Sequence, residues 1–263
     1  MKKAVFFAAI TVFLLLGRSE RGHALVLVGM ETGTLSLSRT SEGIYRNAAA
    51  GENVSMRYTE EISHFGFGPL FEFGFEPGKA GLRLVPFLAE GSTTVSTGRF
   101  TKSTYDLLGF TRSQVESLVK KKNNLTITNN LIGTEILFKY NAPTNIPGKN
   151  EVLKVFRKSV EILGPWLGLG PMANTCTRVV QAGGGKKPAY ARSTYVDFNF
   201  IIAGGLNIHL NSIWEKIPRN IYLVTDVGFV SNLTPDNSQS VQDDNLNTYE
   251  SGLFFKFGAG YDI

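Results

Sequence analysis

Hydrophobic and polar positions alternate strictly along several long segments of this chain. From His64 to Pro77, phenylalanine occupies almost every second position, while His, Gly and Glu lie mainly between. Strict alternation predicts β-strands, because successive side chains of a strand point to opposite faces. Several segments reach about 9–11 residues, the length that a tilted strand needs to cross a membrane. A face made almost wholly of Phe is typical of a barrel wall that meets lipid.

The pattern predicts eight strands in all. Clear alternation recurs at 82–89, 132–140, 195–211, 221–229 and 253–263, and weaker alternation at 25–39 and 160–172. In the first of these weaker segments the register slips around Gly29 to Thr32, which we interpret as a β-bulge. The other is interrupted by glycines and by prolines, which need positions without ladder hydrogen bonds. The predicted fold class is all-β, an up-and-down antiparallel transmembrane β-barrel of eight strands.

The predicted connections alternate in length. The longer set is expected at 40–63, 98–130, 171–193 and 234–247, and the shorter set at 76–81, 141–159 and 211–220, although 141–159 is longer than this pattern predicts. Because bacterial barrels have long outer loops and short periplasmic turns, both termini of the mature chain are expected on the periplasmic side. A short helix is expected in the outer loop 98–130, where Thr111 to Gln114 resembles a capping box. Residues 150–160 fit either a periplasmic helix or the start of the fifth strand.

The first residues predict a secretory signal peptide. Met1-Lys2-Lys3 provides a positive start, Ala4 to Leu16 is an uninterrupted apolar run, and Gly22-His23-Ala24 ends in a small residue. These are the parts of a signal peptide, and the apolar run is shorter than the ~20 residues of a membrane-spanning helix. We therefore expect a signal peptide at 1–24 and one barrel domain at 25–263.

Charged residues of both signs occupy the predicted inner face of the barrel. Because buried charges are costly unless they are paired, we expect an ion-pair network that largely blocks the lumen. Alternatively, some of these residues lie at the wet ends of the barrel, where they need no partner. The candidate interior charges are Glu72, Arg83, Glu135, Lys139, Asp197, Asp226 and Lys256.

The overall charge of the chain is mildly basic. A formal net charge of +5 and a pI near 9.2 suit anionic partners, including lipid phosphates, without selecting among them. Lysines in two predicted outer loops are candidates for contact with lipopolysaccharide phosphates or an anionic host polymer, and solvated loop positions are the alternative. No nucleic-acid partner is expected. The candidate loop residues are Lys120, Lys121, Lys122, Lys186 and Lys187.

No catalytic or metal-binding pattern is recognisable in the predicted barrel. The barrel segment has two histidines, His64 and His209, and one cysteine, Cys176. Ser63 and His64 are neighbours in sequence, so on a strand they point to opposite faces and cannot form a nucleophile–base pair. No metal-ligand spacing is recognisable either. We expect a protein that is not an enzyme and that uses no metal or cofactor.

The C-terminal segment Lys256-Phe-Gly258-Ala-Gly-Tyr261-Asp-Ile263 resembles the terminal sorting signal of outer-membrane barrels. Lys256, Gly258, Tyr261 and Ile263 fill its four fixed places, although many bacterial members end in Phe. The chain after the signal peptide resembles the small eight-stranded barrels of the OmpA/OmpX/OmpW type. The resemblance implies insertion into the bacterial outer membrane by the barrel assembly machinery, with outer-membrane lipids and lipopolysaccharide as surroundings.

These patterns predict an integral outer-membrane β-barrel with a structural or surface-interaction role, whose loops contact lipopolysaccharide or host surface molecules. One alternative is a narrow channel, or a transport barrel for small hydrophobic molecules of the kind that the OmpW resemblance implies. Another is a secreted soluble lipid-binding β-barrel, whose apolar faces would point inward. Alternation alone does not decide which face is inside. The strand lengths, the density of Phe and the C-terminal signal favour the membrane barrel.

Overall fold

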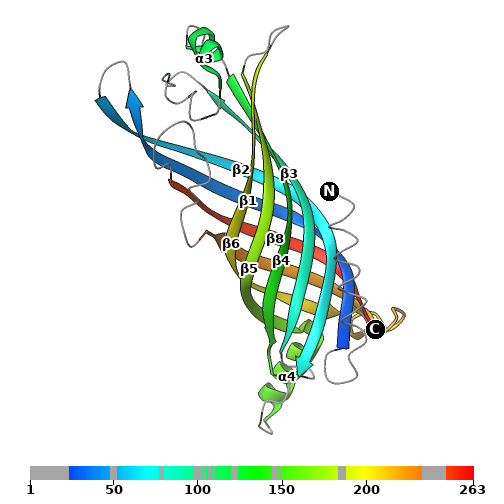
Figure 1. Ribbon diagram of the computed structural model, residues 1–263. Helices are drawn as coiled ribbons and strands as arrows, with labels where there is room; N and C mark the ends of the chain where they lie inside the picture. Colours follow the sequence, from blue (N-terminus) through cyan, green and yellow to red (C-terminus); the bar gives the residue numbers. More distant parts are fainter. Residues whose placement is uncertain are drawn as a thin grey trace.

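The chain forms a closed antiparallel β-barrel in the computed structural model (Figure 1). The strands pair in sequence order, and the last strand pairs with the first to close the ring. This confirms the predicted all-β, up-and-down, eight-stranded fold. The strands are β1 (Ala24–Asn47), β2 (Glu52–Glu76), β3 (Ala80–Ser96), β4 (Asn124–Asn141), β5 (Pro165–Ala182), β6 (Ala189–His209), β7 (Ile221–Ser231) and β8 (Asn247–Asp262).

The structure describes residues 24–47, 52–76, 80–96, 110–119, 124–143, 150–182, 188–232 and 247–263, with a few isolated positions between them. The predicted signal peptide at 1–24 lies outside this part of the chain except for its last position, Ala24, where β1 begins. Its assignment therefore stays a prediction.

Two α-helices lie at opposite ends of the barrel (Figure 1). Helix α3 (Arg112–Leu118) follows Thr111, whose backbone N–H donates to the Gln114 side chain at 2.9 Å, so the predicted capping box and outer-loop helix are confirmed. Helix α4 (Glu151–Leu163) follows Asn150, whose side chain accepts from the Leu153 N–H at 2.8 Å. A short 3-10 helix, η1 (Leu210–Ser212), joins β6 to β7. We name the two ends of the barrel the α3 end and the α4 end.

The fifth strand lies further along the chain than the sequence predicts. Helix α4 occupies Glu151–Leu163, so 150–160 does not start a strand, and β5 begins at Pro165. Gly164 separates helix from strand with a φ of 49°, a left-handed conformation that commonly ends helices. Because β5 continues to Ala182, the predicted outer loop at 171–193 is wrong, and only 183–188 joins β5 to β6.

The predicted register slip in β1 is also wrong. Leu27, Glu31 and Leu35 are buried on the inner face, and Met30 and Thr34 are exposed on the outer face, in unbroken alternation. The one register shift of β1 against β2 lies earlier, between Leu25 and Leu27. The sequence suggests a slip because leucine shares the inner face of β1 with Glu31, so apolar residues occur on both faces.

The connections lie alternately at the two ends as predicted, but the predicted alternation of long and short connections is wrong, because 48–51 and 183–188 at the α3 end are shorter than 142–164 and 210–220 at the α4 end. They are 48–51, 97–123, 183–188 and 232–246 at the α3 end, and 77–79, 142–164 and 210–220 at the α4 end. The start of β1 and the end of β8 both lie at the α4 end, since Leu27 pairs with Asp262. Most strands therefore extend towards the α3 end beyond the segments in which alternation is obvious.

Candidate functional site: the apolar exterior and the filled lumen

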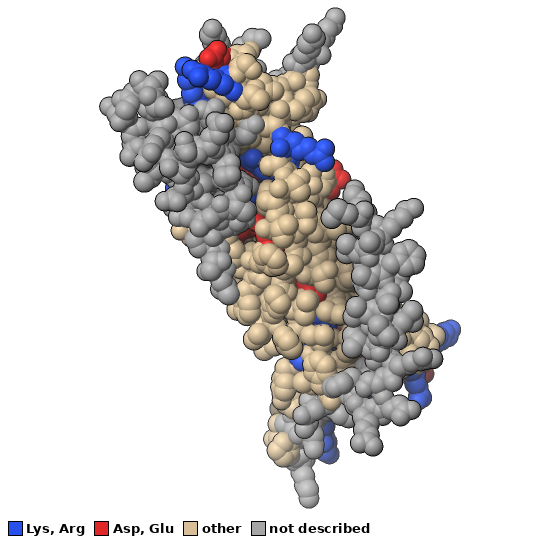
Figure 2. Space-filling view, viewed as in Figure 1, with Lys and Arg blue, Asp and Glu red and all other residues tan. Residues whose placement is uncertain are grey.

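The outer surface of the barrel carries an apolar belt, which Thr32 and Thr34 interrupt on β1. Outward side chains such as Phe198 and Leu167 are 74% and 69% exposed. Figure 2 shows mostly uncharged side chains over the middle of one face, with Lys and Arg nearer the ends. An exposed apolar surface of this kind requires lipid or another apolar partner. The belt comprises Val28, Met30, Phe65, Phe67, Leu82, Leu84, Leu88, Ile132, Phe138, Leu167, Leu169, Val196, Phe198, Ile202, Leu223, Val227, Phe229, Leu253, Phe255 and Phe257.

Towards the α3 end, the outward positions change abruptly from apolar to polar. On β2 the change falls between Phe65 and Ser63, and β3, β4, β5 and β6 change likewise at Leu88/Glu90, Ile132/Asn130, Ala173/Thr175 and Val196/Thr194. Because lipid chains favour apolar side chains and water favours polar ones, this line marks one edge of the membrane. We name the mainly polar region beyond it the outer wall. Its polar outward residues are Thr59, Glu61, Ser63, Glu90, Ser92, Thr94, Thr126, Thr128, Asn130, Thr175, Thr177 and Thr194, and Val179 on β5 is an apolar exception.

Aromatic residues with polar groups mark the other edge of the belt. Tyr140, Trp214 and Tyr261 are 57%, 60% and 53% exposed at the α4 end. Tyr and Trp gather at membrane–water interfaces, where the ring meets lipid and the polar group meets water. The belt therefore has two chemically distinct edges, as a membrane-spanning barrel requires.

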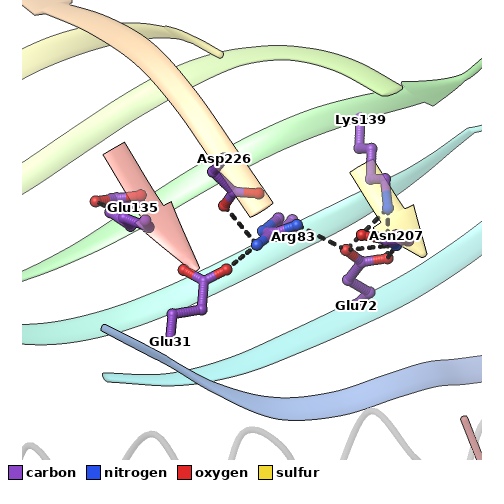
Figure 3. A network of polar contacts seen from close by, with 8 residues as sticks. Glu31, Glu72, Arg83, Glu135, Lys139, Asn207 and Asp226 are labelled. Atoms are coloured by element: carbon purple, nitrogen blue, oxygen red, sulfur yellow. Dashed lines mark hydrogen bonds and ion pairs between the residues drawn. The ribbon is translucent and has the colours of Figure 1, made fainter. Parts of the chain in front are cut away.

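Inside the belt, a buried charge network is centred on Arg83, whose side chain is fully buried (Figure 3). Its guanidinium contacts Glu72 at 3.0 Å, Asp226 at 2.5 Å and Glu31. Lys139 Nζ lies 2.7 Å from Glu72 Oε2. Each carboxylate of this group thus has a cation close by, which offsets the cost of removing it from water.

The network ties together strands from around the whole barrel. Lys256 on β8 pairs with Glu135 on β4, and Asn207 on β6 points its amide at Glu72 on β2, at 3.3 Å (Figure 3). The ring of Trp166 on β5 lies 4.8 Å from the Arg83 guanidinium carbon. We call this group the lower charged layer; its members are Glu31, Glu72, Arg83, Glu135, Lys139, Asp226 and Lys256.

A second group of buried charges lies nearer the α3 end. Arg178 donates to both carboxylate oxygens of Glu60, at 3.1 and 2.5 Å. The guanidinium carbon of Arg39 lies 3.8 Å from the centre of the Tyr195 ring, a cation–π contact. We call this second group the upper charged layer; its buried members are Arg39, Glu60, Arg178, Asp197 and Glu250.

Apolar side chains fill the lumen between and beyond the two charged layers. One cluster includes Phe87, Met172, Ile201 and Phe254 and lies between the layers. Beyond the upper layer, helix α3 and its loop insert their own side chains into the mouth of the barrel. The second cluster comprises Ile62, Tyr105, Leu108, Phe110, Val115, Leu118, Leu125, Ile127, Val180, Ala182 and Ala191. Buried polar and apolar side chains thus alternate in layers along the lumen.

The structure brings most of the predicted interior charges into one layer. Six of them lie in the lower charged layer, and Asp197 lies in the upper one. Sequence reasoning missed Glu31, Arg39, Glu60, Arg178 and Glu250. The signal for Arg178 was alternation with Cys176 and Val180, which continues past the predicted end of strand five.

The remaining candidate residues have different positions. Lys256 points into the lumen, whereas Tyr261 and Ile263 are 53% and 70% exposed at the end of β8. The loop lysines 120–122, 186 and 187 lie outside the described residues. His64 is buried, with its Nδ1 3.2 Å from the Leu35 carbonyl oxygen, and Cys176 is a buried free thiol. In the part of the chain that the structure describes, no group of three or more His, Cys, Asp and Glu residues could hold a metal ion.

No protein-family model matches the chain, and no curated protein matches it. Among solved structures it is similar to the Neisserial surface protein A, with 8% identity over 92% of this chain and 100% of that chain and a TM-score of 0.35. It is also similar to Ail of Yersinia pestis, solved with the heparin analogue sucrose octasulfate, with 8% identity over 90% of this chain and 99% of that chain and a TM-score of 0.33. A third similar structure is the outer membrane protease OmpT from Escherichia coli, with 10% identity over 91% of this chain and 97% of that chain and a TM-score of 0.41.

These similarities are too low to support an argument about activity, so the assignment rests on the chain itself. Among the described residues, no helix is both long and apolar enough to span a membrane. The strands close completely, the exterior carries an apolar belt with a polar edge and an aromatic edge, and the charges lie inside. Closed antiparallel barrels with an exterior of this kind are typical of outer membranes. The chain is a small eight-stranded β-barrel of the outer-membrane type.

Proposed function

We propose that this barrel is a sealed membrane anchor that holds a polar surface outside the cell, and that it conducts neither ions nor small solutes. The main support is the filled lumen. Arg83 is fully buried at the centre of the lower charged layer, and apolar clusters lie on both sides of the upper layer. An open channel needs a continuous wet path, and the full burial of the Arg83 guanidinium supports a lumen that is closed at this level.

The energetics of the network support a lumen that stays closed. To open a path, Arg83 would have to leave Glu72 and Asp226, and Lys139 would have to leave Glu72. Separating the partners of one buried ion pair costs about 3–5 kcal/mol, because each charge then lacks compensation. Because these pairs share Arg83 and Glu72, they would have to break together. The alternative of a narrow channel therefore has little support from this geometry.

The soluble alternative conflicts with the direction of the side chains. A soluble lipid carrier would point its large apolar residues inward, yet Phe198, Leu167 and Leu253 are among the most exposed side chains in the structure. The charges Arg83 and Glu31 lie inside instead. This arrangement suits lipid outside and a packed polar interior.

Planar-bilayer recording tests the closed lumen. The purified, refolded chain should give no stepwise current across a wide range of voltages. A variant with Arg83→Ala and Lys139→Ala, which removes two large side chains from the lower charged layer, serves as the comparison. Regular current steps from the parental chain, at a single amplitude, would contradict the proposal and favour the channel.

The polar surface outside the cell is the second part of the proposal. On β4 the outer wall runs from Asn124 to Asn130, roughly seven residues, which places the strand ends about 15–20 Å beyond the membrane edge at 3.3 Å per residue and a tilt of about 40°. We propose that this wall and its loops contact lipopolysaccharide or host surface molecules. The loop lysines Lys120, Lys121, Lys122, Lys186 and Lys187 are the candidate contacts for anionic groups.

Binding of sulfated polysaccharide to intact cells tests the surface contact. Replacing Lys120, Lys121 and Lys122 together by Gln should weaken binding and its dependence on salt, because fewer ionic contacts remain. The matched control replaces Lys154, Lys158 and Lys216, which lie at the α4 end and should face the periplasm. Equal binding by the two variants would rule out Lys120, Lys121 and Lys122 as the contact.

We also propose that β8 is the segment that the barrel assembly machinery recognises, as the C-terminal resemblance implies. Replacing Tyr261 and Ile263 by Ala should lower the amount of folded barrel in the outer membrane, while leaving refolding of the purified chain in detergent unchanged. Equal loss in both settings would instead indicate a defect in barrel stability.

A further inference from the structure

Helix α4 has an apolar face that no described part of the protein covers. Val152, Val155 and Phe156 are 74%, 66% and 55% exposed, and Leu163 is 38% exposed. At 100° per residue these four side chains fall within about one-third of the helix circumference. Val160, one turn beyond Phe156 at the border of this stripe, is the buried residue of the helix, so the stripe meets the barrel along that border and is exposed elsewhere.

The charged residues of α4 lie on the other side of this apolar stripe. Lys154, Lys158 and Glu161 project from the opposite face and are exposed, and Lys154 Nζ contacts Glu151 at 2.6 Å. An amphipathic helix with exposed apolar residues on one side and lysines on the other has the pattern of a helix that lies in a membrane interface.

The end of α4 is fixed to the barrel at the level of the membrane edge. The Asn207 N–H on β6 donates to the Gly164 carbonyl oxygen at 3.0 Å, and the Ala142 N–H donates to the Pro165 carbonyl oxygen at 2.8 Å. Two outward residues lie directly beside this junction, Leu167 of the belt and Tyr140 of its aromatic edge. They pair with each other across β5 and β4. The apolar stripe of α4 therefore starts where the apolar belt ends.

A neighbouring turn adds apolar groups at the same end. The connection between β6 and β7 follows Asn207 closely and exposes Ile213 and Trp214 at 53% and 60%. Lys216 and Arg219 on the same turn are exposed as well. Trp beside basic residues is typical of segments that rest among lipid headgroups, where the cations face anionic phosphates.

We propose that α4 and the Trp214 turn form an interfacial foot, in which Val152, Val155, Phe156, Leu163 and Trp214 insert among the phospholipids of the periplasmic leaflet. The inference rests on the membrane position of the belt and goes beyond the sealed-lumen function. The occupant is lipid because the stripe continues the lipid-facing belt across a fixed junction. The foot would hold the barrel at a defined depth and resist its movement along the membrane normal.

Site-directed fluorescence in vesicles tests the foot. The full chain is labelled with an environment-sensitive dye at Phe156→Cys, at Lys158→Cys on the charged face, or at Leu253→Cys in the belt. The parental chain, whose single cysteine Cys176 is buried, gives the labelling blank. Each protein is placed in vesicles of phosphatidylethanolamine and phosphatidylglycerol, dilute enough that most vesicles hold one barrel, and faster cold migration in gels verifies folding.

Quenching by lipids with brominated acyl chains and by aqueous iodide then separates the outcomes. The proposal predicts that brominated lipid quenches the Phe156 site several-fold more than the Lys158 site, and that iodide shows the reverse order. Equal and strong iodide quenching at both sites would overturn it, and would leave the stripe free for a protein partner. Protection of the Phe156 site from both quenchers would also overturn it, by indicating a contact with protein. A lack of lipid quenching at Leu253 would overturn the belt itself and not only the foot.

Discussion

Replacing Arg83 by methionine should destabilise the barrel severely. Met keeps much of the volume of the side chain but removes the charge that compensates Glu31, Asp226 and part of Glu72. Lys139 still compensates Glu72 at 2.7 Å, so two buried carboxylates are left without their cation. Leaving one buried charge uncompensated costs about 3–5 kcal/mol, and two carboxylates lose their cation here, so we expect a loss of at least about 4 kcal/mol in the free energy of unfolding.

Urea unfolding of the refolded barrel in detergent measures this loss. With a slope of about 2 kcal/mol per M urea, the midpoint of the Arg83→Met variant should fall by at least about 2 M. The control is Arg112→Gln on α3, whose partner Glu116 lies 3.9 Å away and whose side chain is 94% exposed, so the midpoint should stay within experimental error.

A combined variant separates charge from packing. Adding Glu31→Gln and Asp226→Asn to Arg83→Met removes the two uncompensated charges and should recover about half of the lost stability, since neutral amides cost less to bury than carboxylates. A midpoint for Arg83→Met within about 0.5 M of the parental chain would refute the argument from buried charge. So would a combined variant that is no more stable than Arg83→Met, because packing alone would then explain the loss.

Three further predictions concern the wall, the lumen and the outer mouth. Ile202 points outward in the belt and is 57% exposed, so Ile202→Arg should lower the free energy of unfolding in lipid by about 2–4 kcal/mol. Asn130→Arg on the outer wall should change it by no more than about 0.5 kcal/mol. Equal losses of the two variants in urea unfolding would mean that the belt edge is misplaced. Gly170→Val should abolish the fast-migrating folded band, because a side chain at this position overlaps the Ile136 carbonyl oxygen, while Ala173→Val on the outer face should fold normally. Val115→Asp in α3 should speed proteolysis of the 97–123 loop without changing the heat-dependent mobility shift. An unchanged cleavage rate would show that Val115 does not hold the loop in the mouth of the barrel at the α3 end.

The sequence predicts the strands well where lipid surrounds the barrel. In the segments 64–77 and 253–263, alternate positions are Phe or another apolar residue, because an acyl chain tolerates little else. The polar and small residues between them are then assigned to the lumen. Closure, strand number and the two ends of the barrel follow from the count and spacing of such segments.

Beyond the membrane edge, apolar residues move to the inner face of the strands and polar residues to the outer face, and the prediction of strand ends fails there. On β4 the inward residues Leu125 and Ile127 are apolar, while the outward residues Thr126 and Thr128 are polar. The strand continues, but water replaces lipid outside and an apolar cluster replaces charges inside. A search for apolar outward faces therefore ends these strands too early, as it did for β5 at 171–182 and for the part of β2 that precedes Phe65.

The pairing of charges inside the lumen could be predicted only in part. The inward positions of Glu72, Arg83 and Lys139 follow from alternation on their own strands. Which of them meet depends on the stagger between strands, such as Glu72 opposite Arg83 and Asp226 opposite Lys256. That stagger is set by closure of the whole barrel and leaves no local signal in the sequence.

The most direct test of the membrane barrel is the electrophoretic mobility of the chain from separated cell-envelope fractions, with and without heating in detergent. A closed barrel with this belt should be found in the outer-membrane fraction, should resist the detergent when cold and should migrate more slowly after boiling. A single unshifted band in the soluble periplasm would contradict the account, and would mean that the exposed Phe and Leu side chains face something other than lipid.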